Sequence, residues 1–369
     1  MKKKVLLSEV NPGDKLGQDI FIGQSKLLVS RGTVISQRTL NRIHREGYQS
    51  LVIETEDLSE EAKPAAAAAE GGYSLEQLQS NLDQMRHNIA KTRYIVEEVM
   101  RGRPIPIDVA REVVSVVCDK VLNREDLYSD LMTLRSKDNY TFEHSLGVCI
   151  IGTTIARAAR LPRKEFETLS LTSLMHDIGK LGIEDHILKK PGPLSREEYT
   201  AIKQHPLMGY RIVLRDLNNE TIADSVLQHH ENEDGSGYPY GLRGEKIHPY
   251  AKIIHIADTF DAIVANRAYS ARRTPIKAFE EINLNIERYD YSIYQDFIKQ
   301  FSQYYIGSLV TLNTGHEGYI MHIDSDNPGQ PMIRVGEDII NLNKLRDVYI
   351  TELKITKKHR ASQAGPARQ

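Results

Sequence analysis

The chain has 369 residues, a formal net charge of −2 at pH 7 and 40% hydrophobic residues. This length allows two or three domains with buried cores, and the composition is ordinary for a globular protein. The nearly balanced charge gives no reason to expect a nucleic acid as a partner. No window is apolar enough for a membrane span, the apolar run after the basic start is too short for a signal peptide, and the two cysteines give no disulfide framework. We therefore expect a cytoplasmic protein.

Residues 1–55 have the pattern of a small module of α/β or mostly β type. Short apolar runs between turn signals predict three strands, at Ile20–Ile22, Lys26–Ser30 and Leu51–Ile53. A helix is expected at Gln37–Glu46. Residues 56–74 contain an acidic run, five consecutive alanines and two glycines, which indicates a linker. The module has no catalytic spacing, so we expect a regulatory role, with signalling proteins as candidate partners.

Apolar residues recur at steps of three and four in the helix that is predicted to begin at Leu75. This seam consists of Leu75, Leu78, Leu82, Met85, Ile89, Thr92, Val96 and Val99. One interpretation is that residues 75–100 pair two subunits as a homodimer and relay a signal from the N-terminal module. The other is that the seam packs on the chain's own catalytic region, which would produce the same pattern.

The pattern stays helical from residue 75 to about residue 300, which predicts a central all-α region. Helices are expected at Asp108–Leu122, Asn139–Ala159, Arg163–Ile178, Ser195–His205, 220–231 and Tyr250–Ala265. Ser195 and Glu198 form a capping box, and Gly179 is expected to stop the helix that precedes it.

Histidines and aspartates recur on these successive helices, facing inward or lying at helix ends. They are His144, His176, Asp177, His205, His229, His230 and Asp258. Each alone would fit an ordinary packed core, but the whole constellation would be an odd way to build one. Imidazole with carboxylate suits iron, manganese or zinc. Seven candidate ligands exceed the needs of one tetrahedral ion, so the pattern predicts two divalent metals that share a bridging carboxylate, as in a phosphohydrolase.

Two long motifs carry most of these residues. The first is His176-Asp177-Ile178-Gly179-Lys180, and the second runs His229-His230-Glu231, Asp234-Gly235, Gly237-Tyr238-Pro239 and continues through Gly241–Ile247 and Ala257–Ala262. Over about residues 138–275, the core of a catalytic region at 75–300, the chain resembles the HD-GYP family of cyclic di-GMP phosphodiesterases, which belongs to the all-helical HD phosphohydrolases.

The resemblance implies that the seven residues are metal ligands, that Asp177 bridges two ions, and that these are iron or manganese. It implies hydrolysis of cyclic di-GMP to pGpG by a hydroxide held between the two metals, and it leaves further cleavage to GMP open. Asp177 and Lys180 would be the catalytic residues, with Lys180 neutralising the developing charge.

The expected substrate contacts are Lys180, Gly237, Tyr238, Pro239, Arg243, Arg267 and Tyr269. For the glycine-rich loop, a merely structural turn is the alternative, and Arg243 could equally be a solvated charge. Two positions depart from the family. Tyr140 stands where some members carry a glutamate for a third metal, which favours a two-metal site. Ser270 stands at a basic position that helps to grip the phosphates. His87, His186, His248 and His255 have no place in the pattern, so we expect no role for them.

Short alternating runs at residues 301–355 predict a small C-terminal β module, and residues 356–369 a disordered basic tail. The module lacks the paired arginines of PilZ receptor domains, so we expect no ligand there. Two other interpretations of the whole chain stay open. It could be a receptor that binds cyclic di-GMP without cutting it, which loss of metal ligands would mark. It could also be a phosphohydrolase of another cyclic dinucleotide, which a substrate panel would reveal.

Overall fold

The computed structural model describes residues 75–355, apart from 124–126, 137–139, 160, 266–273 and 346, together with the strands and scattered positions between residues 2 and 54. The chain forms two compact units, Met1–Glu70 and Gly71–Gln369. The expected linker after residue 54 and the expected basic tail after residue 355 lie outside the described residues.

The first unit contains short antiparallel strands. They are β1 (Lys2–Leu6), β2 (Lys15–Leu16), β3 (Ile20–Ile22), β4 (Lys26–Val29) and β5 (Ser50–Glu54). One sheet has the order β1-β5-β2, and β3 pairs with β4. The three predicted strands are confirmed. Strand β1 was missed because three of its five residues are lysines, which leaves no alternation of apolar and polar residues. The helix expected at Gln37–Glu46 lies largely outside the described residues.

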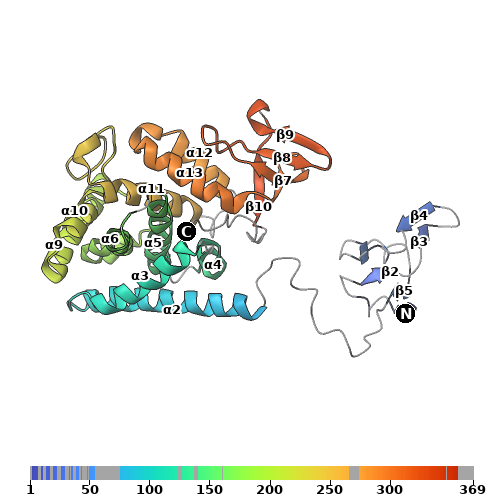
Figure 1. Cartoon of the computed structure of the whole chain (residues 1–369), viewed down its shortest axis with the longest axis horizontal. Helices are drawn as coiled ribbons and strands as arrows, with labels where there is room; N and C mark the ends of the chain where they lie inside the picture. Colours follow the sequence, from blue (N-terminus) through green and yellow to red (C-terminus); the bar gives the residue numbers. More distant parts are fainter. Residues whose placement is uncertain are drawn as a thin grey trace, which may run out of the picture. The chain divides into compact units, whose positions relative to one another are not determined.

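The second unit is mainly helical, as the sequence predicted (Figure 1). Its α-helices are α2 (Leu75–Met100), α3 (Ile107–Leu122), α4 (Leu127–Leu134), α5 (Tyr140–Ala158), α6 (Arg163–Met175), α7 (Asp185–Leu188), α8 (Arg196–Ile202), α9 (His205–Leu217), α10 (Glu220–Gln228), α11 (Pro249–Ala265), α12 (Pro275–Asn283) and α13 (Tyr291–Tyr305). Its 3-10 helices are η3 (Ile178–Gly182), η4 (Gly244–Lys246), η6 (Ile286–Arg288) and η7 (Leu342–Lys344). No helix among the described residues is both long and apolar enough to cross a membrane.

Helix α5 lies at the centre of this unit. Every residue from Glu143 to Ala156 is buried, because α2, α3, α6, α11 and α13 all pack against it. The sequence suggested one inward face, yet the helix has almost no charged residues between Glu143 and Arg157 and can be covered on all sides. His144 therefore points into the interior from a rigid element.

The seam of α2 is buried within the same chain. Met85, Ile89, Val96 and Val99 belong to the common hydrophobic core, and α2 packs on α3, α4 and α5 (Figure 1). Packing on the chain's own helices is thus what the structure shows for residues 85–99. A homodimer through this part of the seam is not supported, because a partner would have to displace that core.

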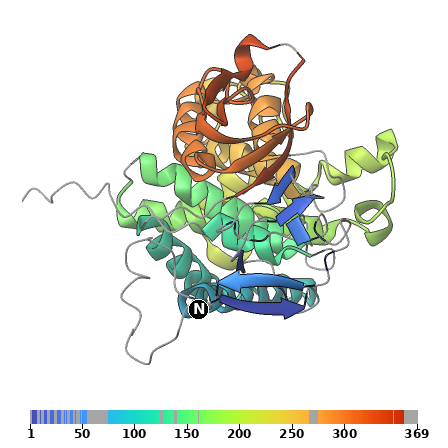
Figure 2. The same cartoon turned by 90° about the vertical axis from the view of Figure 1, so that its right-hand side faces the viewer.

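The C-terminal strands form one antiparallel sheet with the order β10-β6-β7-β8-β9. They are β6 (Leu309–Leu312), β7 (Glu317–His322), β8 (Met332–Val335), β9 (Asp338–Asn341) and β10 (Ile350–Lys354). The sheet lies beside α12 and α13 in both views (Figures 1 and 2). Its buried residues, such as Val310, Ile320 and Ile333, share the core of the helices rather than forming a core of their own.

Aromatic packing holds α11 against α12 and α13. The ring of Phe260 stacks on Phe279 with centroids 5.2 Å apart and meets Phe297 and Phe301 edge to face. Such contacts are worth about 0.5–1.5 kcal/mol each beyond burial. This cluster fixes the helix that carries Asp258.

Candidate metal centre

His176 and Asp177 lie where α6 gives way to η3. Gly179 was expected to stop this helix, but α6 already ends at Met175, and Gly179 lies within η3 without a positive φ. It is required for another reason, because a Cβ here would overlap the backbone carbonyl of His205. The glycine thus brings the end of α6 against the start of α9, and Asp177 close to His205.

The other candidate ligands come from four further helices. The capping box of Ser195 and Glu198 is confirmed, but α8 ends at Ile202 and His205 opens a separate helix. His229 and His230 follow the last residue of α10. His144 comes from α5 and Asp258 from α11.

The structure brings all seven candidate ligands together as two groups. Within each group, every residue offers a ligand atom within 4.8 Å of the others. One group is Asp177, His205, His229 and His230; the other is His144, His176 and Asp258. Each group could hold a metal ion.

Asp177 faces both groups, one oxygen to each. Its Oδ1 lies 3.3 Å from Nε2 of His205 and 3.9 Å from Nε2 of His229. Its Oδ2 lies 3.4 Å from Nε2 of His176 and 3.6 Å from Nε2 of His144. A carboxylate in this position can link two cations.

Backbone carbonyls orient three of the imidazoles. The Nδ1–H of His176 donates to Ser173 O (2.9 Å), that of His205 to Ile202 O (2.7 Å) and that of His229 to Val226 O (2.6 Å). A carbonyl can only accept, so each ring carries its proton on Nδ1. Each Nε2 then presents a lone pair to the centre, as in metal sites.

Two buried atoms without a hydrogen-bond partner indicate that the arrangement fits divalent ions. His176 Nε2 and Asp177 Oδ1 are buried and have no hydrogen-bond partner. A buried polar atom without a partner is costly, and most such atoms in proteins are satisfied. A cation in each group would satisfy these two atoms.

Charges in the cluster favour the forms that bind a cation. Burial raises the pKa of Asp177, but Lys180 and His176 outweigh burial and hold it well below its ordinary value. Burial, reinforced by neighbouring histidines, holds the pKa values of His229 and His230 well below their usual range. The carboxylate is therefore ionised and these two imidazoles are neutral.

His144 differs, because two carboxylates flank it. Burial lowers its pKa, but Asp258, 3.0 Å from Nε2, and Asp261, 2.8 Å from Nδ1, outweigh burial and raise its pKa to about 10. Without a metal, this ring holds a proton between them. A cation at Nε2 would take that proton's place.

Asp261, one turn after Asp258 on α11, was quoted in the motif but given no role by the sequence. Its fully buried carboxylate accepts hydrogen bonds from His144 Nδ1, Arg135 Nη2 and the Tyr128 hydroxyl (3.0 Å). Arg135 also escaped the sequence analysis, because it lies 126 residues from its partner. The three-residue step from Asp258 to Asp261 was the one available signal, since it places both on one helix face.

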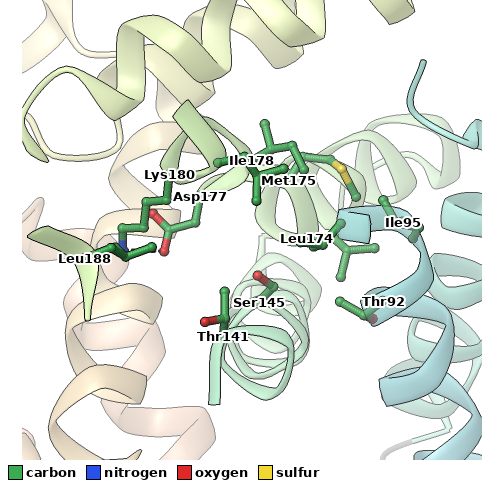
Figure 3. Close-up of a pocket in the computed structure, with 12 residues that line it drawn as sticks. Thr92, Ile95, Thr141, Ser145, Leu174, Met175, Asp177, Ile178, Lys180 and Leu188 are labelled. Atoms are coloured by element: carbon green, nitrogen blue, oxygen red, sulfur yellow. Dashed lines mark hydrogen bonds and ion pairs between the residues drawn. The ribbon is translucent and has the colours of Figure 1, made fainter. Parts of the chain in front are cut away.

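Lys180 lies one turn after Asp177, with its Nζ 2.5 Å from Asp177 Oδ2 (Figure 3). Burial lowers its pKa, but Asp177 and Asp258 outweigh burial and raise it. A cavity of about 40 Å³ borders both residues, with Ile95 of α2 and Ser145 of α5 in its lining. That is too small for a nucleotide, so a substrate would have to reach the centre elsewhere.

The centre opens to solvent at three residues. The side chains of Lys180, His230 and Asp258 are 27%, 19% and 14% exposed. Those of the other five candidate ligands are 6% exposed or less. Aromatic rings stack on two of the candidate ligands. Tyr238 stacks on His230 with centroids 4.7 Å apart, and Tyr140 stacks on His144 with centroids 5.9 Å apart.

Glu143, which lies next to His144, does not face the centre. Its carboxylate accepts hydrogen bonds from the backbone N–H (3.0 Å) and the hydroxyl (3.2 Å) of Ser136. It therefore ties Ser136 to α5 and belongs to neither ligand group.

The glycine-rich loop is folded tightly on its own backbone. A Cβ at Gly237 would overlap backbone atoms of His230, Glu231 and Asn232. The buried Glu231 carboxylate accepts hydrogen bonds from the N–H groups of Tyr240 (2.7 Å) and Leu242 (2.9 Å). For Gly237, the geometry therefore favours the structural turn over close approach to a ligand.

The remaining predicted substrate contacts are less clearly placed. Arg243 is exposed and lies over Gly235, and Pro239 is half-buried. Arg267 and Tyr269 lie outside the described residues, as does Ser270. The histidines without an expected role, His87, His186, His248 and His255, belong to neither ligand group.

Comparisons with known proteins identify what the chain is similar to. A family model for the HD domain matches residues 128–293. A cyclic di-GMP phosphodiesterase of Pseudomonas aeruginosa is 29% identical over 317 residues, which cover 81% of this chain and 76% of that protein. A 3'3'-cGAMP-specific phosphodiesterase of Vibrio cholerae is 36% identical over 151 residues, 41% of this chain and only 33% of that protein.

A solved structure resembles the fold. A Bdellovibrio bacteriovorus protein described as an HDG"Y"P protein matches with a TM-score of 0.50 over 82% of this chain and all of that chain, at 16% identity. At this identity the likeness concerns the fold alone.

Proposed function

We propose that the chain is an HD-GYP-type phosphodiesterase that hydrolyses cyclic di-GMP to linear pGpG at a centre of two divalent ions, iron or manganese. Its matches to the HD-domain model and to a cyclic di-GMP phosphodiesterase support this proposal. The observation that carries this proposal is the position of Asp177. Its two oxygens face two separate ligand groups, and each group has an unpartnered buried atom that a cation would satisfy.

The residues that would hold the ions are the seven described above, with Asp177 common to both. Two divalent ions there would supply Lewis-acid activation of water and charge stabilisation at a phosphate oxygen. This suits a phosphodiester, whose hydrolysis depends mainly on positioning and on neutralising charge.

Lys180 has a separate role in this proposal. Its ammonium is bonded to Asp177 Oδ2 and is partly exposed at the opening. If the Asp177 carboxylate bound cations, its ion pair with Lys180 would weaken. The ammonium could then donate a hydrogen bond to a non-bridging oxygen of the scissile phosphate. A charge-assisted hydrogen bond of this kind strengthens as negative charge develops on that oxygen.

The proposal is tested by chromatography of cyclic di-GMP incubated with protein purified without oxygen, beside an Asp177→Ala variant. We expect pGpG from the intact protein, none from the variant, and loss of bound metal in the variant. Tight nucleotide binding with metal present but no product would instead favour a receptor. Faster hydrolysis of another cyclic dinucleotide would keep the chemistry and overturn the substrate.

A further inference from the structure

A cation and three aromatic rings form a continuous row beside the metal centre. Tyr238 stacks on His230 with centroids 4.7 Å apart and planes 27° apart. The ammonium of Lys203 lies 5.2 Å from the centre of the Tyr238 ring and 4.7 Å from that of Tyr199. The row thus leads from a candidate metal ligand to the protein surface.

Helix α8 places the outer two members of this row. Tyr199 lies within α8, and Lys203 is its C-terminal cap, one turn later. His205 follows two residues on. The segment that delivers a ligand to the centre therefore also delivers Tyr199 and Lys203 to its rim, with a geometry fixed relative to it.

Neither Tyr199 nor Lys203 has an evident structural task. Tyr199 is 49% exposed and fills no core. The nearby lysines Lys189 and Lys190 pair with Asp185 and Glu198 at 2.7 and 2.6 Å. Within the described part of the chain, by contrast, no carboxylate lies within 4 Å of the Lys203 ammonium. Its donors are therefore available to a ligand.

These groups match the chemistry of a guanine base. Aromatic side chains bind any base by stacking. Guanine presents two acceptors, O6 and N7, on one edge, and a lysine ammonium is a common donor to them. Adenine presents N7 beside an amino donor, which an ammonium cannot satisfy.

We propose that Tyr199, Lys203 and Tyr238 form a base-recognition site that selects guanine over adenine in the cyclic dinucleotide. This rests on the proposed phosphodiesterase function. Tyr238 and Tyr199 supply stacking surfaces, and Lys203 reads the guanine edge while the phosphate reaches the ligand groups next to His230. Contacts of this type discriminate between bases by about five- to 150-fold.

The first test compares kcat/KM for cyclic di-GMP and cyclic di-AMP in the intact protein and in Lys203→Met, with Lys189→Met as the matched surface control. We expect Lys203→Met to lower the ratio of kcat/KM for cyclic di-GMP to kcat/KM for cyclic di-AMP by at least fivefold. The change should come mainly from a higher KM for cyclic di-GMP, while the amount of bound metal stays unchanged. An equal loss for both substrates would overturn the proposal and make Lys203 a phosphate contact. Absence of hydrolysis of any cyclic dinucleotide by the intact protein would instead refute the underlying function.

A second test uses 3'3'-cGAMP, which carries one guanine and one adenine. If Lys203 holds the guanine, the intact protein cuts mainly one of the two phosphodiester bonds, and one linear isomer dominates the early products. Lys203→Met should bring the two isomers toward equal amounts, whatever its overall rate. An unchanged isomer ratio would overturn the base-recognition site.

Discussion

At the scale of single residues, the contact between Asp261 and His144 orients one of the two groups of candidate ligands. The carboxylate holds Nδ1 at 2.8 Å, so that Nε2 faces Asp177 and Asp258. Loss of a partner of this kind typically weakens metal binding 10- to 100-fold. We therefore expect Asp261→Asn to weaken binding of one of two Mn²⁺ ions by about that factor, measured by electron paramagnetic resonance of the titrated metal-free protein.

The same substitution leaves Arg135 buried with its charge partner removed, which costs on the order of 3–5 kcal/mol of stability. A double variant, Asp261→Asn with Arg135→Met, serves as the control because it removes the stranded charge. Its stability should recover while the weaker metal binding persists. If both ions bind the single variant as tightly as the intact protein, Asp261 is structural only.

The sequence alone was enough to predict candidate ligands that stand next to another candidate ligand in the chain. His176 with Asp177 and His229 with His230 stand in adjacent pairs, and the structure places all four in the ligand groups. Asp261 and Arg135 could not be joined from the sequence, because a bond across 126 residues leaves no local periodicity.

At the scale of elements, η3 depends on how closely Gly179 approaches α9. We expect Gly179→Ala to push the start of α9 outward, because the added methyl would overlap the rigid backbone carbonyl of His205. Metal analysis should then show loss from the group that contains His205. The matched control is Gly182→Ala in the same element, where the obstacle is the flexible side chain of Met208. Equal metal loss in both variants would contradict this account.

Helix α2 supplies a second prediction at this scale. Ile95 is fully buried on its inner face, whereas Tyr94 beside it is 46% exposed. Ile95→Ala should lower the free energy of unfolding by about 2–5 kcal/mol in urea titrations, and Tyr94→Ala by at most about 0.5 kcal/mol. Light scattering should show no change in oligomeric state for Ile95→Ala. Dissociation of a dimer would restore the pairing interpretation of the seam.

The helices predicted individually could be found because caps and three-to-four-residue apolar steps are local features, whereas α4, α7, α9, α12 and α13 were not located individually. The packing partners of the helices could not be predicted. The seam of α2 carries the same pattern whether it packs on α5 or on another subunit, and only the tertiary structure distinguishes the two. The boundary between α8 and α9 was also misplaced, because the first helix was expected to run as far as His205. Pro206 instead lies in the first turn of α9, where a proline is tolerated.

At the scale of the whole molecule, the two units have separate hydrophobic cores. All seven candidate ligands lie in the second. We expect residues 71–369 alone to fold and to keep both metals and their hydrolytic activity, while any regulation by residues 1–55 is lost. Circular dichroism, metal analysis and product chromatography test this against the full chain. A truncated protein that folds but is inactive would mean that the first unit contributes to the site.

The most direct test of the proposed two-metal centre is titration of the metal-free protein with Mn²⁺ while the rate of pGpG formation is followed. The account predicts that activity stays low through the first equivalent and reaches its maximum at two ions per chain. Full activity at one equivalent, or no activity with two ions bound, would contradict the proposal that Asp177 joins two working metal groups.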